Sequence, residues 1–132
     1  MANFLKAHRA IGPQLRLSTP VQLDELAEWM AMRAHLGKGT VMMLLQELHE
    51  GILYFNRQGA PVKLAGIGTF SPSIDRNGGY DIHLRLDPQL RRGINAPRAY
   101  SGRIHNKSHI GLDDAQYKAI WDQAHPDDPL EL

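Results

Sequence analysis

The apolar positions of this chain follow a helical period in its first half. Apolar side chains recur three and four residues apart over 23–34 and again over 41–55, which predicts two amphipathic helices. We expect the first helix to begin between Pro20 and Leu23, with Thr19 and Gln22 as its capping pair. The pattern therefore predicts a helical hairpin as the first structured part of the chain.

A strand-like period follows. Apolar and polar residues alternate over 70–74 and 80–86, which predicts two half-buried strands. Asn77-Gly78 lies between them, a dipeptide that tight two-residue hairpin turns favour. Asp87-Pro88 then predicts the cap and first turn of a short helix through Ile94, with apolar side chains inward and arginines outward, namely Leu90, Ile94, Arg91 and Arg92.

Glycines mark the passage from helices to strands. The second helix is expected to end near Arg57, with Gly59 as its C-terminal cap. The strand-like run 62–70 is interrupted by Gly66 and Gly68, which have no Cβ and can bend the chain or admit a second backbone at close range. We interpret this stretch as a corner between the helical and the β layer.

The two ends of the chain are less regular. Residues 1–20 are expected to form an extended arm, because Gly12-Pro13 and Thr19-Pro20 interrupt any helix, and Leu15 and Leu17 allow a short added strand. Residues 96–132 form a C-terminal extension with one helix from Asp113 to Ala124 and a frayed acidic end. The central domain is then residues 21–95.

The helices are apolar on more than one face. Trp29, Met32 and Leu36 lie off the main stripe of the first helix, and the second helix carries further apolar residues around much of its circumference. Two short helices and a small ribbon cannot bury this much apolar surface alone. The sequence therefore predicts a homodimer.

Composition narrows the class of protein. The 132 residues contain no cysteine, which excludes disulfides and thiolate metal sites. No apolar run approaches the roughly 20 residues that span a bilayer, so no membrane is expected and we place the protein in the cytoplasm. The net charge of +1 hides an asymmetry, since without its acidic last twenty residues the chain has 14 basic and 8 acidic residues.

At residue level the central domain resembles the HU and integration host factor family of bacterial histone-like DNA-binding proteins. The family signature Gly-x-x-Val-x-Leu-x-Gly-Phe-Gly-Thr-Phe is matched here, with Ile67 in place of the first Phe, by Gly59, Val62, Leu64, Gly66, Gly68, Thr69 and Phe70. The stretch 90–95 is similar to the family's terminal Leu-Lys-x-Ala-Val-Asn helix. The resemblance covers residues 21–95 and implies an α+β, HU-like fold: a helical base, a β-ribbon, a small last helix and an intertwined homodimer.

The resemblance also implies duplex DNA as partner and a nucleoid location. The chain departs from the family in its arm, because only fourteen positions separate Phe70 from Leu84 and no proline stands at the tip. In the family a proline there wedges between base pairs, so the sharp bending that depends on this wedge is not implied here. What remains is a saddle surface with a short hairpin.

Basic residues on the ribbon and the short helix are the candidate phosphate contacts, because neutralised phosphates supply most non-specific affinity for DNA. Asp75 and Asp81 lie near them and would repel phosphates, and the alternative is that these arginines only solvate the surface. The candidates are Lys63, Arg76, Arg85, Arg91 and Arg92.

Other chemistry has less support. Arg98, Arg103 and Lys107 form a basic stretch with three possible roles. It could lie along DNA, pair with the acidic end of the same chain, or only solvate the surface. His105 and His109 have metal-ligand spacing but no third ligand, so neither a metal nor another cofactor is expected. No catalytic constellation is recognisable, and an enzyme is not expected.

The sequence thus predicts a homodimeric, architectural protein that binds duplex DNA with little sequence specificity through backbone phosphates. The alternative is an HU-like dimer used as a protein-interaction or assembly module, with weak or no DNA binding and with the terminal extensions as the surface for a protein partner. The near-neutral charge, short arm and acidic end favour this alternative.

Overall fold

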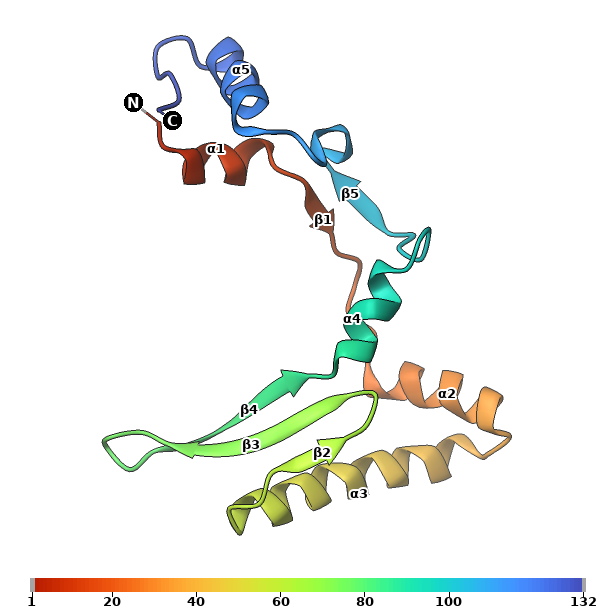
Figure 1. The fold of residues 1–132 in the computed structure, drawn as a ribbon. Helices are drawn as coiled ribbons and strands as arrows, with labels where there is room; N and C mark the ends of the chain where they lie inside the picture. Colours follow the sequence, from red (N-terminus) through yellow and green to blue (C-terminus); the bar gives the residue numbers. More distant parts are fainter. Residues whose placement is uncertain (1, 132) are drawn as a thin grey trace. The chain divides into compact units, whose positions relative to one another are not determined.

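The computed structural model describes residues 2–131, and the chain forms two compact units. The central unit is Thr19–Tyr100, and the terminal unit combines residues up to Ser18 with those from Ser101 onward. Each unit is built from its own helices and strands (Figure 1).

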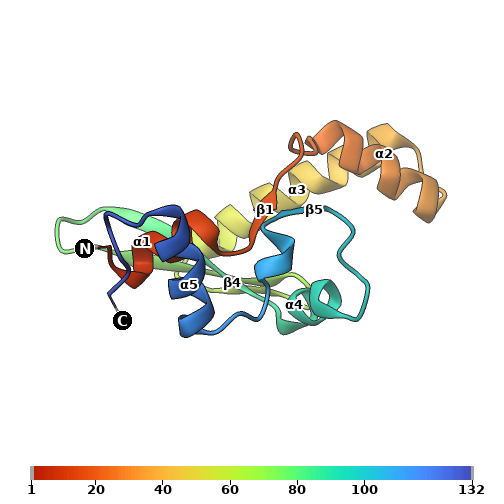
Figure 2. The same ribbon diagram turned by 90° about the horizontal axis from the view of Figure 1, so that it is seen from above.

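The base of the central unit is a helical hairpin of α2 (Leu23–Ala34) and α3 (Lys38–Arg57), which lie side by side in Figure 2. Helix α2 begins at Leu23 as predicted, but Gln22 makes no side-chain capping bond, so the expected capping pair is wrong. Helix α3 ends at Arg57, and Gly59 follows with φ +81°, as a C-terminal cap requires.

A three-stranded antiparallel sheet in the order β2-β3-β4 follows the hairpin. The strands are β2 (Val62–Leu64), β3 (Gly68–Ile74) and β4 (Tyr80–Leu86), and α4 (Pro88–Asn95) comes directly after β4. The amide of Asn56 ties α3 to the sheet, since its Nδ2 donates to the carbonyl of Phe70 at 3.2 Å. The predicted order of helices and strands is therefore confirmed.

The glycine stretch is a β-turn between two antiparallel strands rather than a corner between layers. Ile67 N–H donates to the carbonyl of Leu64, and Gly66 has φ +85° within this turn. Gly68 serves a different purpose, because a Cβ there would lie 2.5 Å from the carbonyl oxygen of Arg85 on β4. Gly66 thus allows the chain to bend, and Gly68 allows a second backbone to approach closely, which are the two properties expected of this stretch.

The hairpin between β3 and β4 is a five-residue turn instead of the predicted two-residue type. Asp75 N–H donates to the carbonyl of Gly79, and Gly78 is in the left-handed region with φ +84°. The Asp75 carboxylate accepts from the N–H groups of Asn77 and Gly79, both at 2.8 Å. This turn resembles a type I turn followed by a glycine bulge, for which only Gly78 needs a positive φ.

The core of the central unit is small. Its buried apolar residues are Ala27, Ala31 and Val41, and no leucine, isoleucine, phenylalanine or tryptophan of its described residues is buried. Leu90 and Ile94 of α4 are 47% and 56% exposed, so the expectation that they point inward is wrong for a single chain. Most of the apolar surface that the sequence offers is not covered within one chain.

The terminal unit corrects the expectation of an extended arm and a frayed end. Residues Phe4–Ile11 form helix α1, capped by Asn3, and only Gln14–Arg16 is extended, as strand β1. Strand β5 (Arg103–His105) pairs with β1, the 3₁₀ helix η1 (Lys107–His109) follows, and α5 (Asp114–Ala124) packs on α1. The capping box of Asp113 and Gln116 fixes the start of α5 close to the predicted residue.

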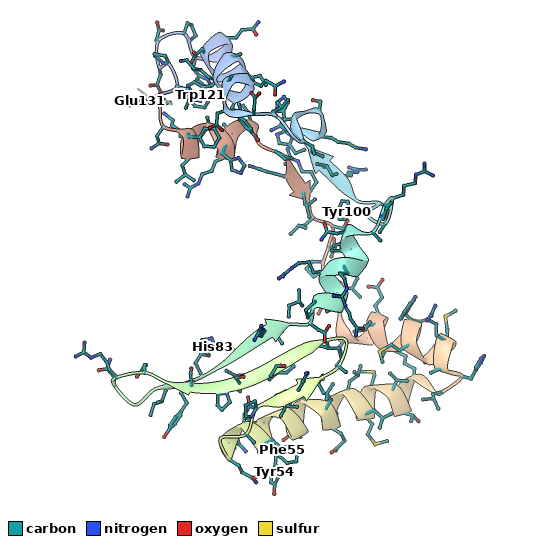
Figure 3. The ribbon with its side chains drawn as sticks, viewed as in Figure 1. Tyr54, Phe55, His83, Tyr100, Trp121 and Glu131 are labelled. Carbon is teal, nitrogen blue, oxygen red and sulfur yellow. The ribbon has the colours of Figure 1, made fainter. Side chains whose placement is uncertain are left out.

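The acidic end of the chain belongs to the core of this unit. Ala2 forms a parallel bridge with Leu130, which is 1% exposed, and Trp121 on α5 is 2% exposed. Trp121 Nε1 donates to the carbonyl of Asp128 at 2.7 Å (Figure 3 labels Trp121). The two ends of the chain therefore close on one another, which local sequence patterns did not indicate.

Gly68→Ala tests the close approach of β3 to β4. The added Cβ would overlap the backbone carbonyl of Arg85 as well as Leu84 Cδ1, and the backbone cannot simply move aside. We therefore expect a loss of about 1–3 kcal/mol in the free energy of unfolding, measured by urea denaturation. Gly51→Ala in α3 is the control, because a Cβ there meets nothing within 4 Å and should stabilise the helix by about 0.5–1 kcal/mol. Equal stability of the two variants would contradict the close approach.

Candidate nucleic-acid interface

The strand register places two of the predicted DNA-contacting residues in one row. Lys63 is opposite Thr69, and Thr69 is opposite Arg85, so the three side chains share one face of the sheet. Lys63 and Arg85 are exposed, and two strand spacings put their Cα atoms about 10 Å apart. The row thus has one cation, Lys63, on one side of Thr69 and a second, Arg85, on the other.

Alternation along β3 and β4 makes this whole face polar. Below the row, Ser71 is opposite His83 and Ser73 is opposite Asp81, while the intervening pairs are apolar and lie on the other face. His83 Nε2 lies 2.8 Å from Ser73 Oγ (Figure 3 labels His83). The polar face therefore carries hydrogen-bonding groups along its length and one carboxylate, that of Asp81.

The apolar face looks toward α3. A cavity of about 650 Å³ lies between the end of α3 and the hairpin. Its lining includes the apolar residues Leu53, Pro72, Ile74, Tyr80 and Ile82 and the polar residues Asn56, Arg57, Ser73 and Asp81. Figure 3 shows Tyr54 on the side of α3 away from the sheet. The sheet therefore has an apolar face toward the helices and a polar face on which Lys63, His83 and Arg85 are exposed.

Asp87 joins the sheet to α4 and lies close to two of the candidate cations. Its carboxylate accepts from the N–H of Gln89 at 2.8 Å, as the N-terminal cap of α4, and from the N–H of Gly66 at 3.1 Å. These two backbone hydrogen bonds, with the nearby charges of Arg92 and Lys63, lower the pKa of Asp87 below its usual value of 3.8. The Asp87 carboxylate thus hydrogen-bonds both the Gly66 turn and the start of α4, and it lies near the charges of Lys63 and Arg92.

The remaining candidates are more widely spread. Arg91 and Arg92 are exposed on α4, and Arg76 is exposed in the turn at the far end of the hairpin. The structure therefore brings Lys63, Arg85 and Arg92 into one region and places Arg76 at the other end of the ribbon. Their contact with DNA stays a prediction.

The acidic neighbours have structural partners. The Asp75 carboxylate is bound by the two N–H groups of its own turn, and that of Asp87 by the cap and the Gly66 turn. Asp81 Oδ1 accepts only from the adjacent N–H of Ile82 among the bonds of the described residues. Asp81 is therefore the acid that opposes an anion on the polar face.

The histidine pair has separate partners. His105 Nδ1 lies 3.1 Å from Arg16 Nη2, and His109 Nδ1 is hydrogen-bonded with the carbonyl of Ile11. No group of three potential metal ligands occurs within residues 2–131. In the same range no helix is both long and apolar enough to cross a bilayer.

Two solved HU structures are similar to this chain. A cocrystal structure of Anabaena HU with DNA is 17% identical, with a TM-score of 0.50, and the similarity covers 58% of this chain and 100% of the HU chain. The chain has an HU-like fold. An HU mutant from Thermotoga maritima is 19% identical, with a TM-score of 0.49, over 56% of this chain and 99% of its own.

The HU-like fold confirms the expected α+β architecture, and the similarity at this level of identity concerns the fold. Because the Anabaena HU chain is matched completely by 58% of this one, the rest of this chain has no counterpart in it. No protein-family model and no curated protein sequence matches the chain.

Asp87→Asn tests the carboxylate that joins the HU-like sheet to α4. Because the pKa is lowered in the folded state, ionised Asp87 stabilises the fold above its usual pKa, and this contribution is lost as the pH falls through the folded-state value. We expect the variant to melt below the parent protein at pH 7 and the difference to shrink as the pH falls below 3.8, the usual pKa of the group. Glu28→Gln, an exposed change on α2, should show no such convergence in thermal melts followed by circular dichroism.

Proposed function

We propose that this protein acts as an HU-like homodimer that binds duplex DNA with little sequence specificity through backbone phosphates. The observation that carries the proposal is the row Lys63–Thr69–Arg85 on the polar face of the sheet, in which both cations are exposed. Backbone phosphates are the partners that such exposed cations favour, and they carry no sequence information.

The charge distribution along the central unit supports this proposal. Residues 58–100 carry six basic and three acidic residues, whereas α2 and α3 carry three basic and five acidic ones. Asp75 and Asp87 each accept from two backbone N–H groups, whereas Asp81 accepts from one. The sheet and α4 are therefore the basic part of an almost neutral unit, and a two-fold symmetric dimer would double this charge.

The similar HU structure from Anabaena was solved as a complex with DNA, which makes duplex DNA the partner to test first. The hairpin here ends in the turn Asp75–Gly79 and has no proline at its tip. We therefore propose backbone contact by the polar face and the turn residue Arg76, without a wedge between base pairs. Nucleoid location in the cytoplasm and an architectural, non-enzymatic role follow from this mode of binding.

The uncovered apolar surface supports the homodimer. A groove of about 410 Å³ between α2 and α3 is lined by Trp29, Leu36, Leu44 and Leu48, which are 38% to 58% exposed. Full burial of one such side chain contributes about 1.5–3 kcal/mol. A second copy offers a complementary surface of the same kind, because a two-fold interface applies the same patch twice.

Loss of the cationic row should weaken DNA binding in a salt-dependent way. Each phosphate contact contributes about 0.9 to the slope of log K against log salt concentration, so Lys63→Gln/Arg85→Gln should reduce that slope by about 1.8 per chain. The measurement is fluorescence anisotropy of a labelled duplex of about 30 base pairs at several salt concentrations. Lys38→Gln/Arg57→Gln removes the same charge from α3, outside the α2–α3 groove, and should change the slope less.

Absence of duplex binding by the folded parent dimer at low salt would contradict the proposal. The second candidate, a dimeric protein-interaction module, is favoured by Asp81 on the polar face and would then remain. Asp81→Asn distinguishes the two, because it should strengthen binding to the duplex only if phosphates lie on this face.

Sedimentation equilibrium tests the dimer. The parent protein should sediment at twice its chain mass of 14.8 kDa. Leu44→Glu places a charge in the α2–α3 groove and should weaken association at least about 100-fold, since two buried leucines are lost per dimer. Met43→Glu is the matched control, because Met43 is 58% exposed and does not line that groove. A monomeric, folded parent protein would refute the homodimer.

A further inference from the structure

The terminal unit has no net charge, but its charges are separated. It contains six basic and six acidic residues, and all its acids lie in or next to α5 and the segment that follows. Three of these acids have partners within the unit: Asp113 caps α5, Asp122 accepts from Lys118, and Asp128 accepts from Lys6. The strands β1 and β5 carry only basic charge.

Strands β1 and β5 lie beside one another in Figure 1, and their register places the basic side chains on one face. Arg16 is directly opposite Arg103, and Gln14 is directly opposite His105, while Leu15 and Ile104 occupy the other face. All four polar side chains are exposed. Like charges directly opposite one another destabilise an antiparallel pair, so an anion between the two guanidinium groups would relieve a repulsion that the fold imposes.

Arg16 is held by one hydrogen bond, and neither arginine pairs with a carboxylate of the described residues. Arg16 Nη2 donates to His105 Nδ1 at 3.1 Å, because a guanidinium has no acceptor. Asn106, just after β5, donates to the carbonyls of Ala10 and Gly12 and so fixes the ribbon to the end of α1. None of the ion pairs among residues 2–131 includes Arg16 or Arg103. Both cations are therefore exposed and available to an external anion, and Arg16 is also oriented by His105.

We propose that the β1–β5 ribbon is a second contact for the phosphates of duplex DNA, separate from the β2–β4 sheet. Planar guanidinium groups bind phosphate in a bidentate manner, and a two-stranded antiparallel ribbon is an element that fits against a DNA groove. The inference rests on the proposed function in one respect, since a duplex held by the central unit raises the local phosphate concentration at the terminal unit.

The assay that tests it uses the full-length protein and the variant Arg16→Gln/Arg103→Gln. Loss of one or two phosphate contacts should reduce the salt slope of duplex binding by about 0.9–1.8 per chain. Lys38→Gln/Arg57→Gln removes two exposed charges from α3 as the matched control and should reduce it less. Thermal melts followed by circular dichroism establish that both variants are folded. Equal slopes for the two variants would overturn the inference.

A second measurement separates this inference from the proposed function. In ¹⁵N spectra of the parent protein, the side-chain Nε–H signals of Arg16 and Arg103 should shift on titration with duplex and not with inorganic phosphate at the same phosphate concentration. Equal shifts with both would mean a site for free phosphate and would overturn the duplex assignment.

The variant Lys63→Gln/Arg85→Gln completes the test. If the duplex shifts the ribbon signals while this variant binds as tightly as the parent protein, the proposed sheet contact fails and the ribbon contact stands. If this variant binds weakly and the ribbon signals of the parent protein do not move, the sheet contact stands and the ribbon contact fails.

Discussion

The rest of the structure depends on one constraint, the apolar surface that the central unit cannot cover by itself. Its buried apolar core consists of two alanines and a valine, while leucines, a tryptophan and aromatic residues of α2 and α3 are a third to more than half exposed. A unit of this size is marginal even with a complete core. The helices therefore leave an apolar surface uncovered within one chain, and the homodimer we propose is the arrangement that uses the same patch twice.

The sheet and α4 are fixed to one another by local interactions that do not need a second chain. Gly68 lets the backbone of β3 pass β4 at a distance that no side chain would allow, and Gly66 turns the chain between β2 and β3. Asp87 then binds both the Gly66 turn and the start of α4. This set of contacts accounts for the glycine signature as a requirement of the fold, independent of any ligand.

Charge is separated in both units, although the whole chain is almost neutral. In the central unit the helices hold the excess of acids, and the sheet with α4 holds the excess of basic residues. In the terminal unit the acids gather around α5, where Lys6 and Lys118 pair with two of them, and the arginines gather on β1 and β5. Since a phosphate backbone is bound by local charge and not by the total, a net charge of +1 is compatible with DNA binding.

The sequence by itself determined the helical hairpin, the two long strands, the cap at Asp87 and the HU-like order of elements, because each depends on periodicity or on neighbours a few residues apart. It also supplied the cations of the sheet, but the row Lys63–Thr69–Arg85 needed the strand register. Local patterns did not predict α1, although Asn3 caps it, because a helix of eight residues is stabilised mainly by its packing on α5 and only weakly by its own sequence.

Only the tertiary structure decided that the two ends of the chain form one unit. Ala2 forms a bridge with Leu130, and Arg16 pairs with Arg103, so both contacts join residues about 90 or more positions apart. Trp121 is buried in a core that both ends of the chain build. No periodicity within a segment can indicate such contacts, because their stability comes from burial and pairing between segments and not from the preferences of either one.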